Sequence, residues 1–256
     1  MSVADLAHYV REASSIVAFT GAGVSTESGI PDFRSPGGVW TRYDPREFTF
    51  DRYVESAEVR ANSWKMREEM MASLPKPNRA HQVLADLEAE GRLLGVITQN
   101  IDGLHQAAGS RNVVEIHGNV REVHCIGLFP RAGVPDGCGF VESHEWAIGL
   151  IEAGDSDPDC PKCGGIVKTA TVSFGQAMPE RAMEQAARMV ADCDLMLAIG
   201  SSLEVYPAAG LPLEAKGAGA TVVIINREPT DLDWVADLVI NGEAGTILDQ
   251  AHQRSK

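Results

Sequence analysis

The chain contains 256 residues and is 44% hydrophobic, which is enough apolar material for one large domain or for a domain with an insertion. Its 36 acidic and 22 basic side chains give a formal net charge of −14, which argues against general nucleic-acid binding and is compatible with a lysine-rich partner. The N-terminal stretch lacks the apolar core of a signal peptide, and no run approaches about 18 apolar residues, so we expect no membrane contact and a cytoplasmic location.

In the first half of the chain, hydrophobic periodicity predicts alternating helices and strands. Apolar residues recur at helical spacing near the N-terminus, and a wholly apolar run follows them. Asn78 is a good N-cap for a helix that stops at Gly91, while Pro75 and Pro77 end the helices before it. The expected elements are a helix over 3–12, a strand over 16–20, short helices over 48–71, a helix over 78–91, strands over 93–98 and 113–116, and a helix over 101–108.

The second half begins with a segment, residues 118–168, in which glycine, proline and cysteine become frequent and periodicity fades. Alternation then resumes, with helices over 179–190, 208–216 and 245–252 and strands over 195–199 and 221–225. This alternation predicts an α/β fold, namely a Rossmann-like parallel sheet with helices on both faces. We expect a single domain, 1–256, with a Rossmann-like part formed by 1–34, 76–117 and 169–256 and a small inserted domain formed by 35–75 and 118–168.

The stretch "AFTGAGVSTESGIPDFR" (18–34) begins like a dinucleotide-binding turn and then departs from that pattern. Gly21 and Gly23 follow an apolar strand and would let the backbone approach a pyrophosphate, with a following helix N-terminus supplying N–H donors. A third glycine is expected at position 26, but Thr26 is there, which argues against an ordinary dehydrogenase fingerprint. Many tight turns use G-x-G without binding a ligand, so this turn alone leaves both interpretations open.

Polar residues follow the other predicted strands as well. "TQNID" ends at Asp102, "EIHGN" contains His117, "IGSS" contains Ser201 and "INRE" contains Asn226. In open α/β sheets ligands bind at this carboxyl edge, and histidine is the side chain best suited to proton transfer near neutral pH. His117 alone is either catalytic or structural, but five polar strand ends in one chain are hard to explain by chance.

Seven stretches, taken in order, resemble the sirtuin family of NAD-dependent protein lysine deacylases. They lie between about residue 14 and residue 248 and read "GAGVSTESGIPDFR", "TQNIDGLHQAAG", "EIHGN", "CPKCGG", "VSFGQAMPE", "GSSLEVYPAAGLP" and "INREPT". The first, combined with "TQNID" and "HGN", is highly specific. The resemblance implies a deacetylase or deacylase that cleaves NAD, transfers the acyl group of an acyl-lysine protein or peptide to ADP-ribose, and releases nicotinamide and free lysine.

The resemblance also implies roles for individual residues. His117 is expected to be the general base, and Asn100 and Asp102 to act at the nicotinamide end, where polar groups would stabilise charge that develops as the glycosidic bond breaks. The expected NAD-binding residues are Gly21, Ala22, Gly23, Thr26, Asp32, Phe33, Arg34, Gln99, Asn100, Ile101, Asp102, Gly200, Ser201, Ser202, Asn226 and Ala244. Two loops are expected to sandwich the peptide as an added strand, through Val172, Phe174, Gly175 and Val205.

The cysteine-rich segment departs from the family's two C-x-x-C pairs. Cys160 and Cys163 form the second pair, but Leu128 stands where a second cysteine is expected after Cys125. Cys138 lies near enough along the chain to supply the fourth thiolate, and four thiolates suit one tetrahedral structural zinc ion.

Two alternatives to this zinc site stay open. His124 or His144 could be the fourth ligand in place of a cysteine, although we expect this less. The segment could also fold without metal.

A second departure concerns the acyl group. Family members that prefer succinyl or malonyl groups carry a Tyr and an Arg three residues apart, where this chain has Trp64 and Arg67. Because the tyrosine hydroxyl is lost, we expect no strong preference for acidic acyl groups. Arg67 is a candidate substrate-binding residue, but a solvated helix charge is the favoured interpretation.

Two other functions would use the same NAD site. A protein mono-ADP-ribosyltransferase would pass ADP-ribose to a protein acceptor, leaving a modified protein and no O-acyl-ADP-ribose. A non-catalytic NAD sensor is disfavoured, because Asn100, Asp102 and His117 are all present. No pattern in the sequence marks an oligomer interface.

Overall fold

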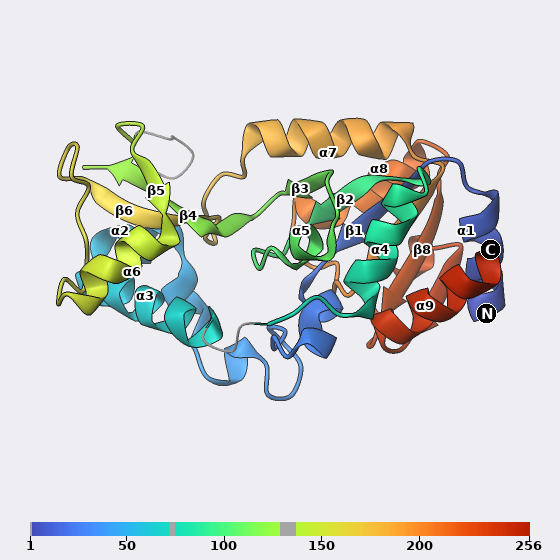
Figure 1. Cartoon of the computed structure of the whole chain (residues 1–256), viewed down its shortest axis with the longest axis horizontal. Helices are drawn as coiled ribbons and strands as arrows, with labels where there is room; N and C mark the ends of the chain where they lie inside the picture. Colours follow the sequence, from blue (N-terminus) through green and yellow to red (C-terminus); the bar gives the residue numbers. More distant parts are fainter. Residues whose placement is uncertain (1, 72–74, 129–136) are drawn as a thin grey trace.

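A six-stranded parallel sheet forms the larger part of the molecule (Figure 1). The computed structural model describes residues 2–71, 75–128 and 137–256. The order reverses between the first and seventh strands, and this reversal places a crevice at their carboxyl ends. The strands lie in the order β3 (Val113–Glu115), β2 (Leu93–Thr98), β1 (Ile16–Thr20), β7 (Leu195–Ile199), β8 (Thr221–Asn226) and β9 (Leu238–Asn241), and each pairs in parallel with its neighbours.

Helices cover both faces of this sheet, which confirms the predicted α/β fold. One face is covered by α1 (Val3–Glu12), α4 (Arg79–Ala89) and α9 (Ala244–Ser255), and the other by α7 (Glu180–Asp192) and α8 (Leu211–Gly217). Strands buried on both faces read as continuous apolar runs, which is why β1 and β7 were visible in the sequence.

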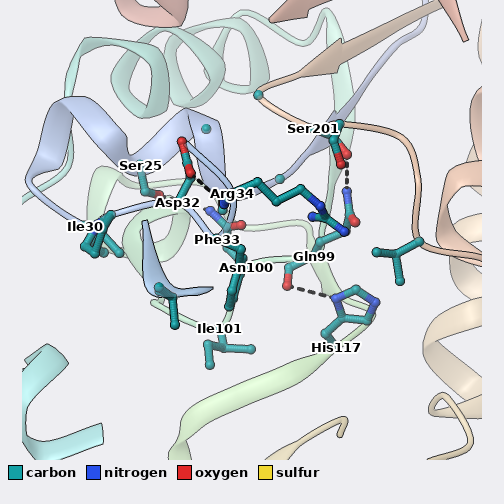
Figure 2. A pocket seen from close by; sticks show the side chains of 18 of the residues that line it. Ser25, Ile30, Asp32, Phe33, Arg34, Gln99, Asn100, Ile101, His117 and Ser201 are labelled. Atoms are coloured by element: carbon teal, nitrogen blue, oxygen red, sulfur yellow. Dashed lines mark hydrogen bonds between the residues drawn. The ribbon is translucent and has the colours of Figure 1, made fainter. Parts of the chain in front are cut away.

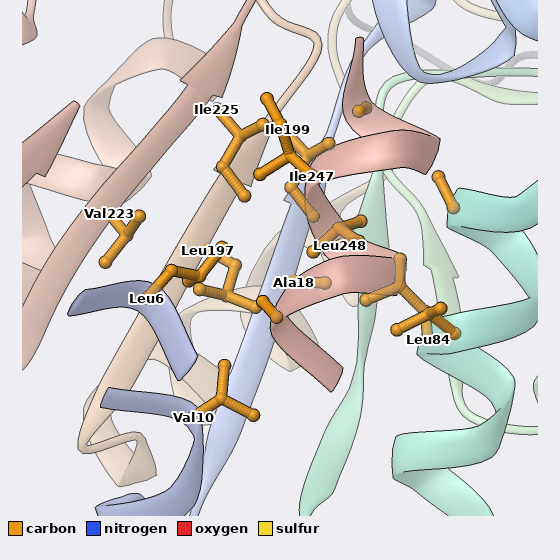
Figure 3. Packing of buried hydrophobic residues seen from close by; sticks show 14 of the residues in the cluster. Leu6, Val10, Ala18, Leu84, Leu197, Ile199, Val223, Ile225, Ile247 and Leu248 are labelled. Atoms are coloured by element: carbon orange, nitrogen blue, oxygen red, sulfur yellow. The ribbon is translucent and has the colours of Figure 1, made fainter. Parts of the chain in front are cut away.

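Alternate residues of each central strand serve the two faces. Ala18 of β1 packs with Leu6 and Val10 of α1, and with Leu197 of β7 (Figure 3). Its neighbour Phe19 points to the opposite face and packs in the cluster beneath α7 and α8. Burial of each large apolar side chain contributes about 1.5–3 kcal/mol, so this sheet is the stable frame to which the polar strand ends are attached.

The smaller part of the molecule lies at the end away from the chain termini (Figure 1). Its antiparallel sheet has the order β5 (Val141–Ser143), β4 (Gly118–Gly127), β6 (Ile166–Thr171). Two small apolar clusters join this sheet to three helices: α2 (Phe50–Glu55), α3 (Ala57–Met71) and α6 (His144–Glu152).

Residues 118–168, where periodicity fades and no elements were predicted, contain β4, β5, β6 and α6. The pairing of β4 with β6 shifts in register between Gly118 and Val123 and again between Cys125 and Gly127, which interrupts the alternation that marks a strand. Residues 129–136 of the segment, and 72–74 of the expected helical insertion, lie outside the described residues. The expected domain boundaries stay a prediction.

Several element boundaries differ from expectation for local reasons. The helix expected over 101–108 is α5 (Leu104–Ala108), because Asp102 accepts the N–H of Leu104 and Gly103 adopts a left-handed φ of 72°. The short helices expected over 48–71 are present as α2 and α3, whereas the helix expected over 208–216 is divided into η4 and α8, and β9 was not expected. The remaining short elements are the 3₁₀ helices η1 (Ala22–Ser28), η2 (Val39–Thr41), η3 (Pro45–Phe48), η4 (Ala208–Gly210) and η5 (Asp233–Val235).

Among the described residues, none of the helices combines the length and apolar character needed to span a membrane.

Candidate active site

A pocket of about 610 Å³ opens at the crevice between β1 and β7 and reaches the smaller part of the molecule. Side chains and backbone from both parts line it. The structure brings together here all the residues expected to act in catalysis or to bind NAD or peptide: Gly21, Ala22, Gly23, Thr26, Asp32, Phe33, Arg34, Arg67, Gln99, Asn100, Ile101, Asp102, His117, Val172, Phe174, Gly175, Gly200, Ser201, Ser202, Val205, Asn226 and Ala244.

The two glycines of the first turn lie directly against the turn after β7. A Cβ atom on Gly21 would lie 2.8 Å from the Gly200 carbonyl oxygen, and one on Gly23 would lie 2.8 Å from the Gly200 Cα. The N–H of Gly23 donates to the same carbonyl. Glycine is therefore required for the two turns to touch, whatever the pocket binds. The Thr26 hydroxyl donates to the Gly23 carbonyl within η1, so the third glycine of a dehydrogenase turn has no place here.

The Asp102 carboxylate is held on several sides. The Ser25 hydroxyl donates to its Oδ2 at 2.8 Å, and the Asn100 side-chain amide donates to both Ser25 Oγ and Asp102 Oδ2, at 3.0 and 3.3 Å. The N–H of Leu104 donates to Oδ1 at 2.9 Å. These contacts fix the polar strand end of β2 against the first turn. Sequence reasoning missed Ser25, although it stands inside the stretch already singled out.

His117 projects into the pocket beside the strand end of β2 (Figure 2). Its Nδ1 lies 3.1 Å from the Gln99 carbonyl oxygen, which can only accept, so Nδ1 carries the proton and Nε2 keeps a free lone pair. Burial lowers the pKa of His117 below its ordinary 6.5, against the opposite effect of the Gln99 carbonyl. The neutral ring is thus the prevailing form at neutral pH, ready to accept a proton at Nε2.

The loop after η1 is organised by Asp32. Its Oδ1 accepts the N–H groups of Arg34 and Ser35, and its Oδ2 accepts the Ser35 hydroxyl. The Asp32 carboxylate therefore shapes its own loop. Phe33 packs on Trp40 with ring centroids 5.1 Å apart, and the Arg34 guanidinium pairs with Glu204.

The two loops expected to hold a peptide border the pocket on the side of the smaller part. Phe174 forms two backbone hydrogen bonds with the junction of η3 and α2: its N–H donates to the Phe48 carbonyl, and its carbonyl accepts the N–H of Phe50. The N–H of Val172 donates to the His117 carbonyl at 2.9 Å, so this loop is tied to the histidine. The Phe174 and Tyr206 side chains are exposed at the mouth.

The favoured interpretation of Arg67 as a solvated helix charge is wrong. Arg67 lines the pocket, and its Nη2 donates to the Thr171 hydroxyl at 2.9 Å. Burial lowers its pKa from the ordinary 12.5. No carboxylate pairs with Arg67 in the described part of the chain. Trp64, one helical turn earlier, is buried, and its indole N–H has no partner among the described residues.

The four cysteines of the smaller part form one cluster. The Sγ atoms of Cys125 and Cys163 are 3.5 Å apart, as are those of Cys138 and Cys160, and all four lie within 4.8 Å of one another. A tetrahedral zinc ion with Zn–S bonds of about 2.3 Å holds its sulfurs about 3.8 Å apart, so this donor set fits structural zinc. Leu128 is exposed, and neither His124 nor His144 joins the cluster of described ligand atoms.

Sequence reasoning also missed pocket residues that belong to no strand end. Trp40, Met66 and Val120 contribute apolar surface to the pocket, and no spacing marked them. Arg227 and Glu243, which also line the pocket, form an ion pair at 3.1 Å. Arg227 directly follows β8 and Glu243 lies two residues after β9, so a pair of opposite charges after two strands was the signal that could have found them.

The fold and the site define a dinucleotide-using enzyme of the α/β class. Its features are a doubly wound sheet with glycine turns at the switch point, the neutral histidine His117 in the pocket, and a cluster of four cysteines. Residues 21–207 match the profile of the Sir2 family. The NAD-dependent protein deacetylase 1 of Bradyrhizobium diazoefficiens is 49% identical over 95% of this chain and 92% of its own length.

Two further comparisons agree. The NAD-dependent protein deacylase 2 of Pyrobaculum aerophilum is 40% identical over 100% of this chain and 96% of its own. The structure of Sir2Tm bound to a propionylated peptide superposes with a TM-score of 0.85 and 34% identity, covering 99% of this chain and 98% of that one. The chain belongs to the Sir2 family, the sirtuins, and is an NAD-dependent protein deacetylase or deacylase.

Proposed function

We propose that this enzyme removes short neutral acyl groups from lysine side chains of proteins in the cytoplasm. NAD would lie along the turns of β1 and β7, and the acyl-lysine would enter between the Val172–Gly175 and Ser202–Pro207 loops. The observation that carries the proposal is that both sets of residues line one pocket, which His117 lines as well. The relative that binds a propionylated peptide supports an acylated peptide as substrate.

NAD is consumed as a substrate and supplies an electrophilic ribose carbon once nicotinamide leaves. Asn100 and Asp102, fixed by Ser25, would bind the nicotinamide end and hold it for cleavage. His117 Nε2 would take a proton from a ribose hydroxyl, and that oxygen would accept the acyl group. With one water consumed, the products are free lysine, nicotinamide and O-acyl-ADP-ribose.

The environment of Arg67 bears on the acyl group. Its guanidinium already donates to Thr171, and the residue one turn before it, Trp64, cannot add a hydroxyl. We therefore expect neutral acyl groups to be preferred over succinyl or malonyl groups.

The test is to incubate the protein with NAD and peptides that differ only in the lysine acyl group, acetyl, propionyl, butyryl, succinyl or malonyl, and to weigh the products. Free lysine peptide together with O-acyl-ADP-ribose of matching mass is the expected result, with acetyl or propionyl fastest. A peptide or protein gaining the mass of ADP-ribose, with no O-acyl-ADP-ribose, would instead establish the mono-ADP-ribosyltransferase. Faster removal of succinyl groups would overturn the neutral preference alone.

A further inference from the structure

We propose that Glu204 makes the enzyme favour substrates with a basic side chain close to the acyl-lysine. The inference rests on the proposed function, because it takes the peptide to lie along the loop that contains Val205. It adds a charge preference of the substrate and the residue that sets it.

Glu204 lies directly before Val205, in a loop that lines the pocket. A peptide that joins Val205 through backbone hydrogen bonds passes the side chains on both sides of that residue, as cross-strand neighbours do in a sheet. Glu204 and Tyr206 are the two residues concerned, and both are exposed. The Glu204 carboxylate therefore stands beside the expected path of the peptide.

The Glu204 carboxylate can accept a further cation. Its Oε2 pairs with Arg34 Nε at 3.1 Å, and both side chains are 45% exposed. Among the described residues, Oε1 has no partner. An ion pair this exposed contributes little, so a substrate Arg or Lys can join Arg34 at Glu204 or replace it at small cost.

The charges around the pocket point in the same direction. The lining residues include five carboxylates, Asp32, Asp102, Glu204, Glu228 and Glu243, and three guanidinium groups, Arg34, Arg67 and Arg227. The chain as a whole carries a net charge of −14. This field attracts cationic peptides over a distance of about 8–10 Å in ordinary salt, but it does not select among positions in the peptide. A direct contact between Glu204 and a substrate side chain does select a position in the peptide.

The test uses acetyl-lysine peptides that are identical except for one residue, Arg, Gln or Glu, placed at each position within two residues of the acetyl-lysine. We compare kcat/KM at saturating NAD for the wild type, E204Q, E204R and E228Q. E228Q is the matched control, because it removes the same charge from the same pocket but not from the Val205 loop. Ratios between peptides for one protein cancel any difference in folded fraction.

The wild type is expected to favour Arg over Gln about two- to five-fold at one or more positions in low salt. The preference should disappear in E204Q, invert toward Glu in E204R, persist in E228Q and shrink in 0.5 M NaCl. A wild type without preference, or an E204Q that keeps it, would overturn the proposal. Loss of the preference in E228Q as well would assign it to the general field and not to Glu204. No turnover of any acetyl peptide would refute the proposed function, and this inference with it.

Discussion

The two parts of this molecule are stabilised in different ways. The larger part buries β1 and β7 completely between two helical layers, so apolar burial dominates its stability. The smaller part has only two small apolar clusters, and Cys125 and Cys160 occupy buried positions in one of them. A small module with so little core depends on other constraints, such as metal ligation and buried polar contacts.

Buried polar groups in the smaller part illustrate the difference. Lys168 is fully buried, its Nζ donates to the Thr171 carbonyl, and burial lowers its pKa well below 10.5. Each such group is costly to bury and must keep its partners. Variants in the smaller part should therefore lose folding, whereas variants at the strand ends of the large sheet should lose catalysis with the fold intact.

Loss of one thiolate from the cysteine cluster should have the largest effect. Structural zinc contributes on the order of 10 kcal/mol to the folding of small modules, and four protein ligands leave no open position for catalysis. We expect about one zinc per chain by elemental analysis, lost in Cys160→Ala and in Cys138→Ala, with activity falling as the smaller part unfolds. Cys193→Ala, which changes a buried cysteine at the end of α7, should keep its zinc.

The same experiment tests whether Cys138 is the fourth zinc ligand. Full zinc content in Cys138→Ala would mean that another group completes the site. Absence of zinc from the wild type would mean that the smaller part folds without metal.

His117→Ala should have the next largest effect, on rate and not on folding. Loss of a general base lowers turnover about 10²–10⁴-fold, while NAD binding and the melting temperature should change little. Because burial lowers the His117 pKa, the neutral base persists below pH 6.5, so the acidic limb of the wild-type kcat/KM profile should lie below that pH. Turnover, calorimetric NAD binding and thermal melting check this; unchanged turnover would exclude His117 from the mechanism.

The same contrast separates what the sequence predicts from what it does not. β1, β2 and β7 were predicted because continuous apolar runs mark buried parallel strands, and the polar residues after them were placed at one edge because parallel strands end together. β9 was missed because Leu238–Asn241 is short and half-buried. β4 was missed because its register shifts hide the alternation.

Most contacts between distant segments could not be predicted from the sequence, because local patterns do not show which segments become neighbours. The local sequence "WKMR" does not predict that Arg67 donates to Thr171 inside the pocket, because a lone arginine on a helix is usually solvated. Ser25 reaches Asp102 only because the turns of β1 and β2 are adjacent in the sheet. The gathering of Cys138 with three other cysteines was predicted because the chemistry of zinc demands a fourth ligand.

Mild acid should weaken the large sheet by a smaller amount, through two buried histidines. Burial lowers the pKa of His81 to about 4 and that of His105 to about 3, and the neighbouring His81 lowers the latter further. Since both folded pKa values lie below the ordinary 6.5, the unfolded chain binds more protons, and stability present above pH 6.5 is lost as pH falls toward 4. The loss at pH 5 is on the order of 4 kcal/mol. Hydrogen exchange of β1 and β7 amides at pH 7, 6 and 5 measures it within the sheet, and a constant exchange free energy would contradict it.

Replacement of Arg60 by lysine should give the smallest of these effects, confined to the smaller part. Arg60 Nε and Nη2 each lie 2.8 Å from an oxygen of Asp157, while Nη1 donates to the Tyr53 and Val54 carbonyls at the end of α2. The arginine is only 13% exposed, so it ties α2 and α3 to the loop before Cys160 with little competition from water. Lysine keeps the charge but cannot make these planar, bidentate contacts. We expect Arg60→Lys to cost about 1–2 kcal/mol of folding free energy and to speed the loss of zinc to a chelator.

Arg46→Lys is the matched control, because Arg46 also contacts a carboxylate, that of Asp44, but is 88% exposed. If both variants release zinc at the wild-type rate, the smaller part does not depend on the Arg60 contacts, and metal ligation alone would explain its stability.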